Sequence, residues 1–190
     1  MKKLITFALV AIFSVPLLNA QESMFNVGDK VVNIGIGLGS LYGSGLYYKT
    51  SVPPVSISYE QGILDGILEK GVIGVGAYVG YTSYKWHYVY STWDYGWKYT
   101  NIVIGARGSF HYPLLDKLDT YVGIILGYNI VISSAFGDDS GYLYDYSPDR
   151  GSVAYSGYVG GRYYFSDKFS AFAELGYGIA YLTLGVGIRL

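Results

Sequence analysis

Side chains able to do chemistry are sparse in this sequence. Only 14% of its 190 residues are charged, and it contains no cysteine and two histidines. Acid–base or nucleophilic catalysis needs converging groups, and His87 has only Asp94 as an acid nearby in the sequence. His111 precedes a predicted turn. No G-x-S-x-G motif and no Cys/His metal set occurs, so we expect neither an enzyme nor a cofactor.

Four aspartates fall within one polar stretch, residues 133–152. Carboxylate oxygens are ligands that Ca²⁺ prefers, so this stretch is a candidate calcium site. The spacing of Asp138, Asp139, Asp145 and Asp149 matches no EF-hand loop. We therefore expect a solvated acidic loop and no metal.

A second stretch, residues 84–98, contains all three tryptophans of the chain. Trp86, Trp93 and Trp97 stand among tyrosines and flank His87. Such an aromatic surface could bind a carbohydrate or a protein partner. Aromatic rings also gather ordinarily at membrane interfaces, so we favour a loop that dips into the lipid headgroups.

Five charged residues stand inside segments in which every second residue is apolar. Successive side chains of a strand point to opposite faces, so the charges share a face with glycine, serine and tyrosine. Opposite charges in a narrow space usually pair, because an unpaired buried charge is costly. We predict a network of ion pairs on this face, formed by Glu60, Arg107, Arg162, Glu174 and Arg189.

The alternation is clearest at the end of the chain, residues 182–190. Every even position there is leucine, valine or isoleucine, and the odd positions are threonine, glycine or arginine. Seven further segments alternate in the same way, at residues 30–39, 55–62, 72–82, 100–112, 120–130, 153–165 and 169–178.

The lengths of these segments and of their connections suit a membrane barrel. Most segments have about nine to thirteen residues, enough for a tilted strand to cross a bilayer, whereas soluble sandwich strands are shorter. Short turns near 65–70, 113–118 and 166–168 alternate with long loops at 41–54, 84–98 and 133–152. The connection near 178–180 departs from this pattern because it is short. The sequence predicts an all-β fold: an eight-stranded antiparallel up-and-down transmembrane β-barrel.

The first twenty residues predict export. Lys2 and Lys3 precede an apolar run that ends in Asn19-Ala20, which is typical of a signal peptide cleaved before Gln21. Residues 21–190 would then form the barrel in the cell outer membrane. Both mature termini would lie in the periplasm, with the long loops outside the cell. The weak net charge of −1 gives no reason to expect nucleic-acid binding.

Outward-facing aromatic residues cluster toward the segment ends. Rings at both bilayer interfaces form the girdles of outer-membrane barrels. We assign the following residues to two such girdles: Tyr81, Tyr128, Tyr155 and Tyr177 on the loop side, and Phe110, Tyr112, Tyr163, Phe165 and Phe169 on the turn side.

Several motifs resemble those of the small eight-stranded outer-membrane β-barrels of the OmpA/OmpX-like superfamily. The chain is most similar to the barrel-only "porin family" type of the Bacteroidetes. The motifs are the turns 112–117 and 164–169, the run 173–178 and the ending 184–190. The resemblance implies outer-membrane lipid as surroundings and the barrel-assembly machinery as a partner during biogenesis. Members of the superfamily often end on an aromatic residue, whereas this chain ends on Leu190.

Three functions are compatible with such a barrel. An eight-stranded barrel is just wide enough to be filled by its own side chains, which favours a plugged lumen and a structural or surface-interaction role through the loops. A narrow porin-like channel for ions or small solutes is the alternative, and a lipid-modifying enzyme is third. A soluble calycin-like barrel is disfavoured, because it would expose apolar side chains such as Ile34 and Val186 to water.

Overall fold

The computed structural model describes residues 23–42, 48–87, 96–137 and 151–190. These residues form eight strands: β1 (Lys30–Leu38), β2 (Tyr48–Ile67), β3 (Gly71–His87), β4 (Gly96–Leu115), β5 (Leu118–Phe136), β6 (Gly151–Tyr164), β7 (Phe169–Gly176) and β8 (Leu182–Arg189). No helix among the described residues is long and apolar enough to cross a membrane.

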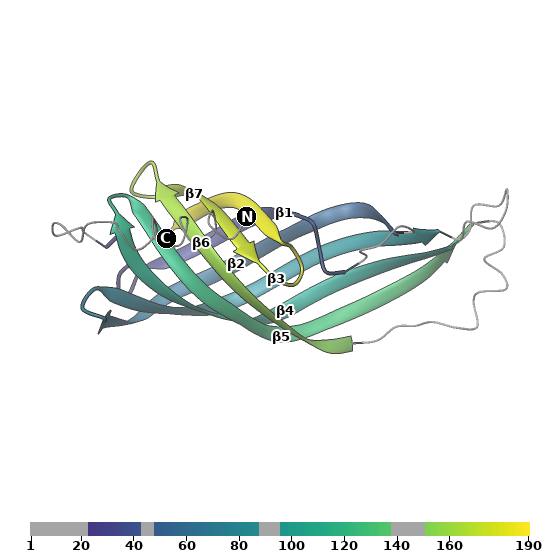
Figure 1. Ribbon diagram of the computed structural model, residues 1–190, viewed down its shortest axis with the longest axis horizontal. Helices are drawn as coiled ribbons and strands as arrows, with labels where there is room; N and C mark the ends of the chain where they lie inside the picture. Colours follow the sequence, from purple (N-terminus) through teal and green to yellow (C-terminus); the bar gives the residue numbers. More distant parts are fainter. Residues whose placement is uncertain (1–22, 43–47, 88–95, 138–150) are drawn as a thin grey trace, which may run out of the picture.

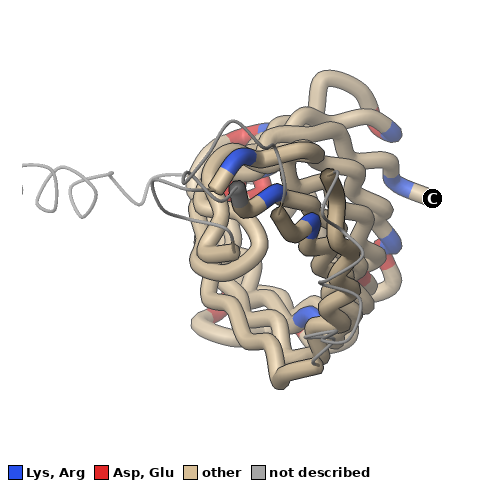
Figure 2. The backbone as a smooth tube through the Cα atoms, turned by 90° about the vertical axis from the view of Figure 1, so that its right-hand side faces the viewer, with Lys and Arg blue, Asp and Glu red and all other residues tan. Residues whose placement is uncertain are grey.

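The strands close into one antiparallel barrel in sequence order (Figures 1 and 2). β1 pairs with β8 from Val31↔Arg189 to Leu38↔Leu182, and this ladder closes the ring. The predicted all-β, eight-stranded up-and-down transmembrane barrel is therefore confirmed.

The two faces of the wall follow the alternation of the sequence. On β5, buried Tyr121, Ile125 and Asn129 alternate with exposed Val122 and Ile124. Outward apolar side chains on other strands are also about half exposed, as on β1 and β8. An apolar surface that encircles a protein in this way suits lipid, which argues against the soluble barrel.

Four strands are longer than predicted. β2 begins at Tyr48, β3 continues to His87, β4 begins at Gly96 and β5 continues to Phe136. The predicted loops 41–54, 84–98 and 133–152 are therefore too long, because part of each is strand. The sequence pattern misses these extensions because polar and aromatic residues occupy both faces there, while the backbone ladder needs no apolar alternation.

The two ends of the barrel differ. At one end, called the turn end, the strands are joined by residues 68–70, 116–117 and 165–168, and Leu190 lies there. At the other, called the loop end, β7 and β8 are joined by residues 177–181. β3, β4 and β5 extend well past that connection, so the wall is tall on one side and low on the other (Figure 1).

Candidate functional site in the barrel lumen

Four of the five charged residues predicted to form a network meet in the lumen. Arg107 on β4 binds Glu174 on β7, with Nη2 2.7 Å from Oε1, and its Nε lies 3.7 Å from Oε1 of Glu60. Arg162 on β6 places Nη2 3.2 Å from Oε2 of Glu60 on β2. All four residues are buried, so their charges are balanced by each other rather than by water.

Two further groups, which the sequence pattern does not place in the network, belong to this cluster. His111 on β4 lies between two carboxylates: Nδ1 is 2.8 Å from Oδ1 of Asp119, and Nε2 is 3.2 Å from Oε1 of Glu60. Asp119 also lies 3.3 Å from Nη1 of Arg162. The inward parity of β4 could have indicated His111, but Asp119 stands beside a turn, where the alternation begins and gives little signal.

The charge balance of the cluster depends on His111. Glu60, Asp119 and Glu174 supply three carboxylates, and Arg107 and Arg162 supply two guanidinium groups. Both ring nitrogens of His111 face carboxylate oxygens, and a neutral ring carries only one N–H. The imidazolium form fits these distances, because it carries an N–H on both nitrogens and makes the cluster neutral.

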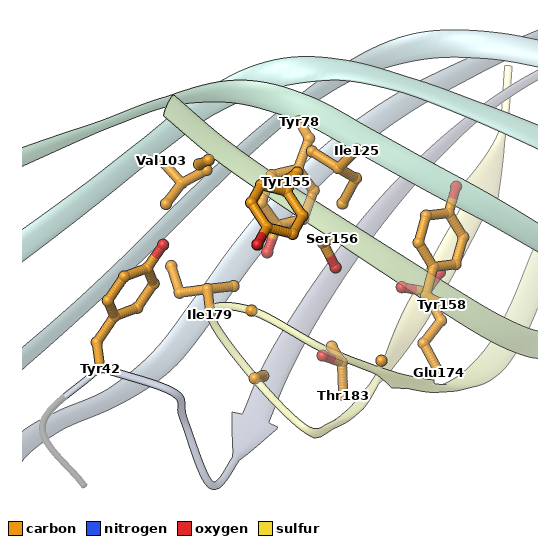
Figure 3. Close-up of a pocket in the computed structure, with 14 residues that line it drawn as sticks. Tyr42, Tyr78, Val103, Ile125, Tyr155, Ser156, Tyr158, Glu174, Ile179 and Thr183 are labelled. Atoms are coloured by element: carbon orange, nitrogen blue, oxygen red, sulfur yellow. The ribbon is translucent and has the colours of Figure 1, made fainter. Parts of the chain in front are cut away.

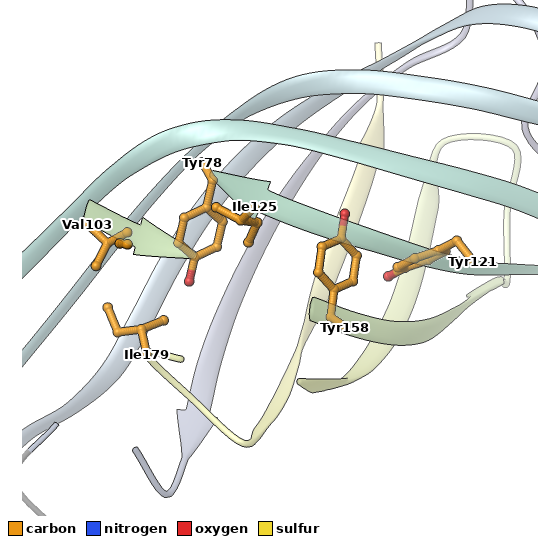
Figure 4. Packing of buried hydrophobic residues seen from close by; sticks show 7 residues of the cluster. Tyr78, Val103, Tyr121, Ile125, Tyr158 and Ile179 are labelled. Carbon is orange, nitrogen blue, oxygen red and sulfur yellow. The ribbon is translucent and has the colours of Figure 1, made fainter. Parts of the chain in front are cut away.

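Tyrosines line the lumen beside these charges, and Figure 4 shows Tyr78, Tyr121 and Tyr158 among the buried residues. The Tyr121 hydroxyl donates to Oε1 of Glu174 at 2.8 Å. The guanidinium carbon of Arg107 lies 4.2 Å from the ring centroid of Tyr158, and the hydroxyls of Tyr158 and Ser109 are 2.6 Å apart. Planar guanidinium groups stack well on aromatic rings, so rings and charges pack as one unit.

Arg189 does not join the ion pairs. Its Nη2 donates to the backbone oxygen of Met24, and its guanidinium carbon lies 4.4 Å from the ring centroid of Tyr164. Among the described residues it has no carboxylate partner. The described residues do not place it in the network: β8 puts it at the turn end, where it contacts the segment that precedes β1.

That preceding segment, residues 23–29, closes the turn end of the lumen. Phe25 is 1% exposed and stacks on His111, with ring centroids 4.0 Å apart. The segment is held by hydrogen bonds from Gly28 N to Gly62 O and from Gly62 N to Asp29 O, each 3.0 Å. The sequence pattern does not predict this segment, because a single phenylalanine in a segment without periodicity carries no strand signal.

Lumenal glycines make room for the large groups. A Cβ on Gly74 would lie 3.0 Å from both Oε1 of Glu60 and Nε2 of His111. A Cβ on Gly123 would lie 2.3 Å from the Tyr158 hydroxyl, and one on Gly160 would lie 2.7 Å from the Tyr121 ring. Small residues on the inner face are thus the steric counterparts of the charged and aromatic ones.

Above the cluster, toward the loop end, lies a small cavity (Figure 3). Its volume is about 40 Å³, with Glu174 and Tyr158 at one side and Tyr42, Tyr78 and Ile179 among its walls. A buried water needs a cavity of roughly 10–15 Å³, so this cavity has room for a few waters only.

The other predicted residues lie on the wall. Trp86 and Trp97 are cross-strand partners on β3 and β4, and the backbone of His87 pairs with that of Gly96, so these residues are in strands rather than a loop. Trp93 lies outside the described residues, as do the four aspartates considered for calcium. Within the described residues no group of acidic or histidine side chains could hold a metal ion.

The residues assigned to girdles lie toward both ends of the outer face. Tyr128 pairs with Val153 near the loop end of β6, and Tyr155 and Tyr177 have ring centroids 6.4 Å apart. Tyr163 and Phe169 flank the 165–168 connection at the turn end. Tyr81 pairs with Ile102 on the tall side of the wall. Their role as interfacial anchors stays a prediction.

The solved structures that this chain resembles include outer-membrane proteins. Ail, the attachment invasion locus protein of Yersinia pestis, matches with a TM-score of 0.51 and 14% identity, over 86% of this chain and 99% of that one. The chain has the fold of the small outer-membrane β-barrels. Escherichia coli outer membrane protein W matches with a TM-score of 0.48 and 15% identity, over 87% of this chain and 99% of that one.

The N-terminal β-barrel domain of Pseudomonas aeruginosa OprF has a TM-score of 0.47 and 16% identity, over 87% of this chain and 98% of that domain. No protein-family model matches the chain. No curated protein matches it either.

Proposed function

We propose that this protein is an outer-membrane barrel whose lumen is closed by its own side chains, with a structural or surface-interaction role. The observation that carries the proposal is the buried cluster of Glu60, Arg107, Arg162, Glu174 and their partners, which spans the lumen between β2, β4, β6 and β7. Phe25 closes the turn end below the cluster. An ion would have to separate buried charge pairs in order to pass.

Conductance of the refolded mature protein in a planar lipid bilayer tests this proposal. Heat-modifiable gel migration shows that the inserted sample is folded. We expect a folded sample to give the same trace as the lipid alone. Steady steps that change in size in Arg107→Ala would overturn the closed lumen and support a narrow channel for ions or small solutes.

We also propose that residues 1–20 are removed on export, that the assembly machinery inserts the barrel, and that the turn end faces the periplasm. Short turns on the periplasmic side and longer loops outside are usual for outer-membrane barrels. Interaction with partners at the cell surface would then involve the tall side of the wall, where β2 to β5 extend toward the loop end.

The lack of cysteine makes this orientation easy to test. Thr50→Cys places a thiol at the exposed loop end, and Asp116→Cys places one at the exposed turn end. We expect a membrane-impermeant maleimide to label only Thr50→Cys on intact cells, and both variants after lysis. Labelling of Asp116→Cys alone on intact cells would reverse the orientation.

A further inference from the structure

Three lysines form one cross-strand row at the loop end of the wall. Lys49 on β2 pairs with Lys85 on β3, and Lys85 pairs with Lys98 on β4. Ser134 on β5 continues the row as the partner of Lys98. Neighbouring strands are about 4.8 Å apart, so the three stems emerge within about 10 Å of each other.

The row faces outward and continues the lipid-facing surface. Tyr81, Ile102 and Ile130 form an outward row in the same ladder, and Lys85 and Lys98 lie four residues farther along β3 and β4. The β3–β4 ladder has no register shift between these rows, so alternation keeps both on the same face. The aromatic pairs Tyr84↔Tyr99 and Trp86↔Trp97 occupy the opposite face.

The distance from the apolar surface matches the headgroup layer. Four strand residues span about 13 Å, and strand tilt reduces the height to about 10 Å. A lysine has a flexible four-carbon stem that can bring its ammonium back toward a lipid phosphate. The row therefore stands at the height at which phosphate groups of the outer leaflet would lie.

None of the described residues neutralises the positive charges of the three lysines. Like charges directly opposite on neighbouring strands destabilise a sheet. No described carboxylate lies within ion-pair distance of the row, and the one aromatic contact is that of Lys85, whose Nζ is 4.6 Å from the ring centroid of Phe136.

The turn end is built differently. Each lysine of its connections adjoins an acid in the sequence: Lys70 follows Glu69, Lys117 follows Asp116 and Lys168 follows Asp167. Figure 2 marks the positions of basic residues in blue and those of acidic residues in red along the backbone. Lys49, Lys85 and Lys98 at the loop end have no acid adjacent in the sequence.

We propose that Lys49, Lys85 and Lys98 bind the phosphate groups of outer-leaflet lipid headgroups. The proposal rests on the proposed outer-membrane location and orientation. A phosphorylated lipid is favoured over a soluble anionic polymer because the row lies on the lipid-facing side of the wall, directly beyond its apolar surface. Bound phosphate would supply the negative charge that the described residues do not provide at this row.

Native mass spectrometry of the folded mature protein in detergent tests the proposal with phosphorylated lipid A as the probe. Wild type is compared with the triple variant Lys49→Gln/Lys85→Gln/Lys98→Gln. The matched control Lys70→Gln/Lys117→Gln/Lys168→Gln removes the same charge from the turn end. Heat-modifiable migration confirms that each sample is folded.

We expect wild type and the turn-end control to retain the lipid, and the loop-end triple variant to bind it about a hundredfold more weakly, since each lysine near an anionic surface contributes about fivefold. Dephosphorylated lipid A should not be retained. Equal retention by both triple variants, or of both lipids, would overturn the proposal.

Two further binding measurements identify the source of the phosphate. Inorganic phosphate at the same concentration as the lipid should not displace it, and displacement would assign the row to free phosphate instead. Binding of sulfated polysaccharide without lipid binding would also overturn the proposal. The detergent experiment requires no particular orientation, so a failure of the proposed function appears in the conductance and labelling experiments and a failure of the lipid site appears here.

Discussion

Glu60 is the residue on which the lumenal cations converge. Its two carboxylate oxygens face Arg107, His111 and Arg162, and the side chain is fully buried. Replacing one partner of a buried ion pair leaves the others without compensation, which costs more than the pair itself contributes. At the residue scale, the stability of the lumen therefore depends on a few buried charged groups, each of which compensates the charge of the others.

Replacement of Glu60 tests this dependence. We expect Glu60→Gln, which keeps the shape but removes the charge, to lower the free energy of unfolding by about 3–5 kcal/mol. Urea unfolding in lipid vesicles, followed by tryptophan fluorescence, measures the change. Glu69→Gln at an exposed turn is the control and should leave stability unchanged. An unchanged Glu60→Gln barrel would contradict the network.

Two glycines test the steric counterpart of the network. A Cβ on Gly123 would press on the Tyr158 hydroxyl, whereas a Cβ on Gly157 would meet nothing within 4 Å. We expect Gly123→Ala to destabilise the barrel by about 1–3 kcal/mol. Gly157→Ala should leave stability unchanged or raise it by up to about 1 kcal/mol. Equal effects in the same unfolding experiment would show that the lumen is not tightly packed.

At the element scale, strands are delimited by backbone pairing more than by side-chain pattern. The alternation correctly predicts all eight strands and their inward faces, because one face meets lipid. It fails beyond the lipid, where Trp86 and Trp97 pair although no apolar face remains. Their aromatic and polar neighbours are typical of a loop by composition, but β3 and β4 continue to support each other's hydrogen bonds there.

The turn between β2 and β3 carries avoidable strain. Leu68 and Glu69 have φ of 50° and 76°, a left-handed conformation that costs residues other than glycine and asparagine about 1 kcal/mol each. We expect Leu68→Asn/Glu69→Gly to raise the free energy of unfolding by about 1–2 kcal/mol. The same urea titration measures it, with Asp116→Asn in the neighbouring turn as a control. A loss of stability would mean that Leu68 makes contacts that outweigh its conformation.

At the scale of the whole molecule, the barrel is closed in two ways. The ladder between β1 and β8 joins the ends of the sheet, and the segment 23–29 folds back into the turn end. Phe25 packs with Val31 and Val72, so this segment belongs to the core even though it precedes the first strand. Both closures involve parts of the chain that are distant in sequence.

Truncation of Phe25 tests the second closure. We expect Phe25→Ala to lower the free energy of unfolding by about 3–5 kcal/mol, because a buried ring leaves a cavity beside His111 and Arg162. Urea unfolding measures this, and hydrogen exchange of the amides of Gly28 and Gly62 should accelerate. Val27→Ala, an exposed neighbour, is the control. Unchanged exchange would mean that the segment is held without its ring.

The sequence by itself determined the architecture of this protein, because a period of two and a strand length set by the bilayer leave few other folds. It also indicated which side chains point inward, since parity along a strand follows from backbone geometry. Only the tertiary structure decided which of these side chains meet. Glu60 and Arg162 are separated by 102 positions, and they touch because the register around a closed ring brings them to the same height. The same closure brought Glu60 to His111 and Arg162 to Asp119, and it left Arg189 with the chain before β1, contacts that no local pattern encodes.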